Sequence, residues 1–337
     1  MEPIGAYLRG RFEIESVTAE ALRARVVLPA DLQGPPRIAH GGAVAALLLE
    51  TAERHARETG GLRGLPRPLR IDVTLARAVP LDASVVALAH RLEGGAYASR
   101  ISRPDGTLLA EAQVAASAPR SKSPASTDGT VLARAGLASD PLEERAGGAI
   151  EDARAVSSGA ESAARAAQVP GASMCLACGP RNPRGLHVRL EYDASRVWKR
   201  VTAPSHWREA DGSASPALAL VLLDEIGWWL GALACGECGL STRLAITLGD
   251  PVAADAPLRV VGARARVVTD DPRRRVWRSR AALLAPDGRA AASAEVAFAG
   301  GPAFTKSMAA DLFDPADLEA ARRLFPRAEI PARENTS

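Results

Sequence analysis

The stretch HGGAVAALLLETAERHA, residues 40–56, decides how this sequence folds. Its apolar residues recur with a helical period, so we predict a helix from roughly Gly41 to Glu58. Two glycines at a helix start leave backbone N–H groups unpaired and let another group come close, at the positive end of the helix dipole. The turn therefore predicts a site for a carbonyl oxygen, although a glycine-rich loop entering a core helix has the same pattern.

The second half of the chain repeats the first. PADLQGPPRIAHGGAVAALLLE (residues 29–50) matches PSHWREADGSASPALALVLLDE (residues 204–225) at an offset of 175 residues, and the Thr74-Leu75 and Thr247-Leu248 pairs match at an offset of 173. Offsets that drift by a few residues indicate loop insertions between equivalent elements, so the chain is a duplication of a unit of about 120 residues.

Each unit combines one long helix with several strand-like stretches. Alternating apolar residues predict strands at 11–16, 21–28, 67–78, 83–92, 96–102 and 108–117 in the first unit, and at 186–193, 197–203, 242–249, 256–268, 274–285 and 290–300 around a helix at 216–234 in the second. One apolar helix and a set of antiparallel strands indicate an α+β fold in which the sheet wraps the helix.

The His-Gly-Gly turn, the sequence Leu222-Leu223-Asp224-Glu225 and the segment CLACGPRNPRGL (residues 175–186) together resemble hotdog-fold thioesterases of the phenylacetate-degradation (PaaI-like) type. The resemblance implies two hotdog domains, each a long helix wrapped by an antiparallel sheet, packed as a pseudo-dimer in one chain. It also implies an acyl-CoA thioesterase whose active site lies at the interface of the two domains, and it leaves further homo-oligomers open.

The expected organisation has four parts. The first hotdog domain takes residues 1–118 and the second takes residues 173–301. Residues 119–172 contain no aromatic side chain and predict a flexible linker. Residues 302–337 form a tail in which Asp314-Pro315 predicts the start of a short helix.

Composition excludes some classes of function. The net charge is +3, from 42 basic and 39 acidic residues, so the chain is not predicted to bind nucleic acid. The N-terminus has no signal-peptide pattern, and we expect that no apolar run reaches the length needed to span a bilayer, so we expect a cytoplasmic protein.

The family pattern places an acid nine positions after the histidine, and the two units depart from it in complementary ways. Asp224 has Ser215 at the histidine position, whereas His40 has Leu49 at the acid position. In the family each site takes its glycine turn from one subunit and its acid from the partner. The resemblance therefore implies one complete composite site, at which Gly42 faces Asp224, and one inactive site.

At the complete site, Asp224 would act as general base or nucleophile and Glu225 would be the alternate base. Gly41 would contact substrate and the N–H of Gly42 would polarise the carbonyl. His40 is expected to shape the turn in preference to moving protons. The alternative for Asp224 is an ordinary helix acid paired with an arginine, and the alternative function is a non-catalytic protein that binds or senses acyl-CoA. A hotdog dehydratase is disfavoured because no matching motif is present.

All four cysteines lie in Cys-x-x-Cys pairs, Cys175 with Cys178 and Cys235 with Cys238. Two such pairs can supply four thiolates to a tetrahedral structural zinc ion. The 56 intervening residues exceed the loop of a zinc ribbon, so reduced structural thiols remain the alternative. No cofactor is expected for catalysis itself.

Overall fold

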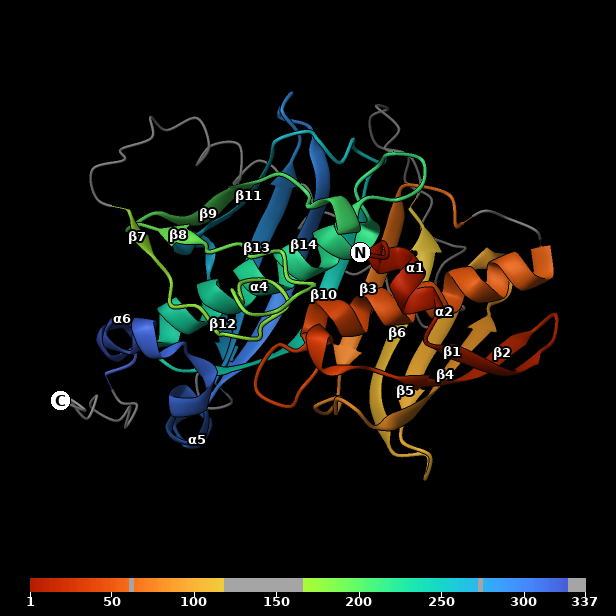
Figure 1. The fold of residues 1–337 in the computed structure, drawn as a ribbon, viewed down its shortest axis with the longest axis horizontal. Helices are drawn as coiled ribbons and strands as arrows, with labels where there is room; N and C mark the ends of the chain where they lie inside the picture. The colour runs from red at the N-terminus through yellow and green to blue at the C-terminus, as the bar shows by residue number, and fades with distance from the viewer. Residues whose placement is uncertain (61–63, 118–165, 272–274, 327–337) are drawn as a thin grey trace.

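The computed structural model describes residues 1–60, 64–117, 166–271 and 275–326. Two long helices, α2 (Gly41–Gly60) and α4 (Pro216–Cys235), lie against one face of a large antiparallel sheet (Figure 1). Helix α2 packs on the strands of the first unit and α4 on those of the second, which is the layering that one apolar helix per sheet requires.

The first unit consists of α2 and six strands, preceded by a short helix, α1 (Ile4–Arg9). The strands are β1 (Phe12–Val17), β2 (Ala21–Val27), β3 (Leu69–Leu75), β4 (Ser84–Arg91), β5 (Tyr97–Ser102) and β6 (Leu108–Ala116). In β3 the buried side chains alternate with less buried ones, as expected for a strand with one face on the core.

The second unit consists of α4, eight strands and a C-terminal helical segment. The strands are β7 (Ala167–Gln168), β8 (Glu191–Tyr192), β9 (Arg196–Val201), β10 (Gly239–Leu248), β11 (Leu258–Ala263), β12 (Val268–Asp271), β13 (Val276–Leu284) and β14 (Ala290–Gly300). Two helices follow, α5 (Pro302–Leu312) and α6 (Leu318–Leu324).

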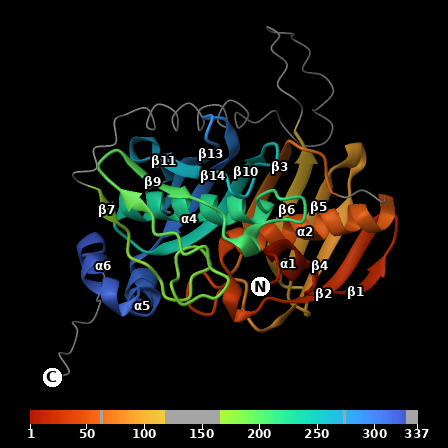
Figure 2. The ribbon, with the colours of Figure 1, turned by 45° about the horizontal axis from the view of Figure 1, so that its top comes forward.

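The two units join through β3 and β10, which pair antiparallel from Leu69 opposite Leu248 to Thr74 opposite Arg243. The sheet order is β1-β2-β4-β5-β6-β3-β10-β14-β13-β11-β9-β8-β7, so the order read outward from the junction is equivalent on both sides. Helices α2 and α4 pack together at their N-terminal halves and run outward in opposite directions (Figure 2). The predicted α+β fold of two hotdog domains, packed as a pseudo-dimer, is confirmed.

Some predicted elements differ from the structure. The strand expected at 186–193 is reduced to β8, because the N–H groups of Leu186 and Val188 donate to the carbonyls of Leu176 and Ala177 and not to a neighbouring strand. The strand expected at 256–268 stops at Ala263, where a short 3₁₀ turn follows.

The predicted linker lies largely outside the described residues, but its last part does not behave as a linker. Residues 167–168 form β7, and Val169 is fully buried. In the tail, the side chain of Asp314 accepts a hydrogen bond from the N–H of Ala316 at the turn before α6, so the predicted terminal helix is confirmed. Helix α5 was not predicted.

Helix α4 is long and apolar enough to cross a membrane by length and composition, which contradicts the expectation that no run reaches that length. Its most apolar window has a mean hydropathy of 1.7 and is 78% buried inside the protein. The apolar character of α4 therefore follows from its place as the core helix of the second unit, where it packs against the sheet and against α2.

Candidate active site

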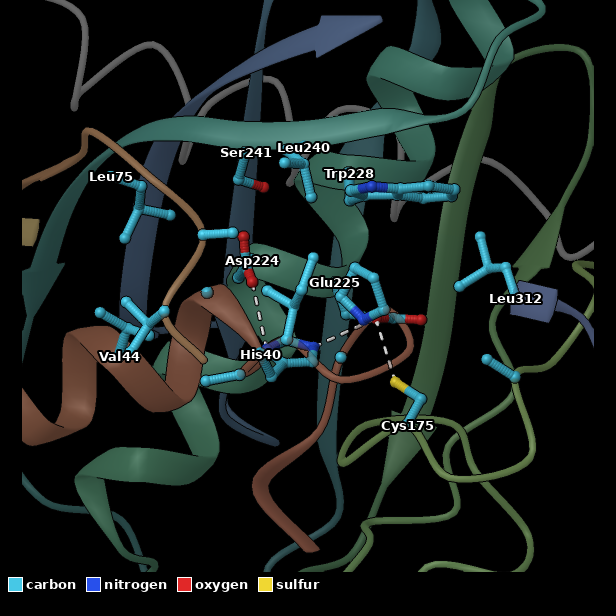
Figure 3. A pocket seen from close by; sticks show the side chains of 18 of the residues that line it. His40, Val44, Leu75, Cys175, Asp224, Glu225, Trp228, Leu240, Ser241 and Leu312 are labelled. Atoms are coloured by element: carbon cyan, nitrogen blue, oxygen red, sulfur yellow. Dashed lines mark hydrogen bonds and ion pairs between the residues drawn. The ribbon is translucent and has the colours of Figure 1, made fainter. Parts of the chain in front are cut away.

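A cavity of about 210 Å³ lies where α2 begins, against the middle of α4 (Figure 3). His40 and Gly41 line it from the first unit, and Asp224 and Glu225 line it from the second. The structure thus brings together the predicted glycine turn and the predicted acid, which lie more than 180 residues apart in the sequence.

Asp224 is 4% exposed and holds its carboxylate in a defined orientation. One oxygen, Oδ2, accepts a hydrogen bond of 2.8 Å from the N–H of Gly42 and lies 3.1 Å from Nδ1 of His40. The other oxygen, Oδ1, is buried and has no hydrogen-bond partner among the described residues, and the same holds for Oγ of Ser241 on β10. Figure 3 shows the second carboxylate oxygen pointing away from His40, toward the side of the cavity that bears Ser241.

The close approach of α4 explains the glycine pair. A Cβ atom at Gly41 would lie 2.7 Å from Oδ2 of Asp224, and a Cβ atom at Gly42 would lie 2.5 Å from the backbone of Leu220 and Val221. The expectation that the glycines make room for a substrate carbonyl is corrected for Gly42, because α4 fills that space and Asp224 accepts its N–H. Gly41 lines the cavity.

His40 bridges the two acids of α4 and is 3% exposed. Its Nε2 lies 3.3 Å from Oε2 of Glu225, while Oε1 of Glu225 accepts a hydrogen bond of 3.1 Å from Nε1 of Trp229. Burial alone would lower the pKa of His40, but hydrogen bonds to Asp224 and Glu225 raise it to about 10. Both oxygens of Glu225 have partners, which makes Glu225 a less suitable base than Asp224.

The far end of the cavity is apolar and includes a part that sequence reasoning missed. Trp228 and Trp229 of α4 line it together with Leu312, the last residue of α5, and Phe313, which follows it. Phe313 and Phe325 stack with ring centroids 5.5 Å apart, and both rings lie 6.2 Å from that of Trp229. The only sequence signal for this wall was the apolar spacing of the tail.

The two cysteine pairs lie apart. Cys175 and Cys178 line the cavity, and Sγ of Cys175 is 3.8 Å from Oε2 of Glu225. Cys235 and Cys238 lie at the other end of α4, because ten residues of helix beyond Glu225 span about 15 Å. Among the residues that the structure describes, the only group of three or more metal-ligand atoms within 4.8 Å of one another is His40, Cys175 and Glu225. The structure therefore does not support a zinc site of four cysteines.

The equivalent place at the start of α4 differs. A cavity of about 70 Å³ lies there, lined by Ser215 and Pro216 but not by Leu49 or Glu50. Glu50 is buried and pairs with Arg57, and it lies 3.9 Å from a guanidinium nitrogen of Arg9. Burial raises the pKa of Glu50 to about 7, although Arg57 opposes the shift.

Comparisons with known proteins support the fold. No protein-family model and no curated protein sequence matches this chain. Among solved structures, the TesB protein of Mycobacterium avium subsp. paratuberculosis is 12% identical, covers 88% of this chain and 99% of its own, and has a TM-score of 0.52. A thioesterase II candidate from Thermobifida fusca is also 12% identical, covers 87% of this chain and 98% of its own, and has a TM-score of 0.52. At these identities the similarity shows a shared fold.

Proposed function

We propose that this protein hydrolyses acyl thioesters, with Asp224 as the base, at the composite site where α2 meets α4. The observation that supports this most is the asymmetric environment of the Asp224 carboxylate. Oδ2 is anchored by Gly42 and His40, whereas Oδ1 is buried without a partner beside the cavity. A buried carboxylate oxygen without a partner is costly, so its retention fits a task in binding or activating a ligand.

The task that fits is activation of water. Asp224 and Ser241 both line the cavity, and we assign to a water there the hydrogen bonds that Oδ1 and Oγ lack. Asp224 takes a proton from this water while the water oxygen attacks the thioester carbonyl. The carbon–sulfur bond then breaks, and Asp224 passes the proton to the leaving thiolate. The positive end of α2, where Gly41 lines the cavity, stabilises the negative charge that develops on the carbonyl oxygen.

The cavity favours an apolar acyl group. Trp228, Trp229 and Phe313 form its far end, where an acyl chain or ring would be removed from water. Coenzyme A as the carrier, and a cytoplasmic location, belong to this proposal and rest on the sequence resemblance to PaaI-like thioesterases.

The experiment is a panel of acyl-CoA thioesters of different chain length and aromaticity, with release of free thiol measured by a chromogenic reagent. We expect turnover of at least one apolar member, at a rate that saturates with substrate. Binding of acyl-CoA by calorimetry with no thiol release across the panel would contradict the proposal and favour the non-catalytic acyl-CoA-binding function.

A further inference from the structure

Three side chains beside the cavity form a cluster of metal-ligand type that the proposed hydrolysis does not explain. Nε2 of His40, Sγ of Cys175 and Oε2 of Glu225 all lie within 4.8 Å of one another and are buried. The thiol of Cys178 interacts with that of Cys175, so the second sulfur of this Cys-x-x-Cys pair adjoins the cluster. Hydrolysis by Asp224 requires no thiol at this place.

Two of the three distances between these atoms are close to those expected around one zinc ion, and the third is below 4.8 Å. Zinc bonds of about 2.0 Å to nitrogen and oxygen and about 2.3 Å to sulfur, in tetrahedral geometry, place the nitrogen and oxygen about 3.3 Å apart and the oxygen and sulfur about 3.5 Å apart. The corresponding distances here are 3.3 Å from His40 to Glu225 and 3.8 Å from Cys175 to Glu225.

Each of the three side chains also has the outer partner that a metal ligand requires. Nδ1 of His40 faces the carboxylate of Asp224. Oε1 of Glu225, the oxygen that is not in the cluster, accepts a hydrogen bond from the indole N–H of Trp229. Sγ of Cys175 accepts the backbone N–H groups of Ala177 and Cys178, at 3.3 and 3.5 Å, and N–H donors stabilise a thiolate. Such second partners orient ligands and raise metal affinity.

We infer that His40, Cys175 and Glu225 form a binding site for a zinc-like divalent cation that links the two hotdog domains. His40 comes from the first unit and the other two ligands come from the second, so an ion here would join the turn before α2 to α4 and to the cysteine loop. Binding would displace protons from the imidazole and the thiol. The inference does not depend on the proposed hydrolysis, because its tests measure the ion and not turnover.

The test begins with full-length protein stripped by a chelator and titrated with zinc or cobalt. We expect about one ion per chain, a rise in melting temperature with zinc, and a cobalt spectrum that contains a thiolate charge-transfer band and intense tetrahedral d–d bands. Cys175→Ser should remove the charge-transfer band. It should weaken zinc binding by more than the roughly 10- to 100-fold loss that is typical when a residue that hydrogen-bonds to a metal ligand is replaced.

Cys238→Ser is the matched control, because Cys238 is also a buried cysteine of a Cys-x-x-Cys pair but lies at the other end of α4. It should bind zinc as the unmodified protein does. Substoichiometric binding, or a cobalt spectrum without a sulfur band in the unmodified protein, would overturn the inference whether or not the variants fold. Equal loss of zinc in Cys175→Ser and Cys238→Ser would overturn it as well.

Discussion

At the start of α2, the turn His40-Gly41-Gly42 faces Asp224 of α4. At the start of α4, the equivalent residues are Ser215-Pro216-Ala217, and the residue of α2 equivalent to Asp224 is Leu49. The following residue is glutamate in both helices, but its partners differ. Glu225 bonds to His40 and Trp229, while Glu50 pairs with arginines. Asp224 and Glu225 thus line a cavity of about 210 Å³, whereas Glu50 pairs with arginines and does not line the cavity of about 70 Å³ at the start of α4.

The largest expected effect is on catalysis at the first of these sites. Asp224→Asn keeps the acceptor for the N–H of Gly42 but removes the base, so the rate of thioester hydrolysis should fall by about 10²- to 10⁴-fold. Thiol release measures the rate, and binding of acyl-CoA should stay near normal. A variant that kept more than a tenth of the activity would show that Asp224 is not the base.

The second effect concerns the stability of the two helix starts. Gly42→Ala places a Cβ atom 2.5 Å from the backbone of α4, so the free energy of unfolding should fall by about 1–3 kcal/mol. Ala217→Gly is the change at the equivalent position and should cost about 1 kcal/mol, from backbone entropy and the loss of a buried methyl group. Denaturant unfolding of both variants measures the difference, and equal losses would mean that the close approach is not specific to α2.

The burial of Glu50 predicts a pH dependence of stability. The pKa of Glu50 is raised from 4.5 to about 7, so the unfolded carboxyl ionises first as the pH rises. The stability that this group contributes is complete below about pH 4.5 and is lost as the pH rises to about 7, a change of up to about 3 kcal/mol.

Glu50→Gln should remove this dependence, so unfolding free energies measured between pH 4.5 and 8 should fall less with pH in the variant than in the unmodified protein. Glu319→Gln provides the control, because Glu319 is on the surface and its side chain is 77% exposed. Parallel pH curves for the unmodified protein and Glu50→Gln would show that Glu50 ionises normally in the folded state.

The smallest effect is expected at the counterpart of His40. The side chain of Ser215 makes no capping hydrogen bond, so Ser215→Ala should change the hydrolysis rate by no more than about 2-fold. The same thiol-release assay applies. A loss of 10-fold or more would mean that the second place takes part in turnover and that the two sites have not diverged in function.

The features of this comparison that depend on the helical period of apolar residues and on the internal repeat could be predicted from the sequence. The apolar period located α2 and α4, and the offset between the halves identified Asp224 as the acid with no counterpart at Leu49. The distance between the two helices could not be predicted, because it depends on how side chains of distant segments pack. For that reason the N–H of Gly42 was assigned to substrate although Asp224 accepts it, and the cysteines were paired with each other although Cys175 lies beside Glu225.

The C-terminal wall of the cavity has a consequence for biosynthesis. Phe313 and Phe325 pack against Trp229, and they lie beyond both hotdog domains in the chain. A ribosome releases residues in order, so the two domains can pair before this wall has been made. Until residues 313–325 emerge, Trp229 lacks both of these aromatic neighbours and the cavity lacks this wall.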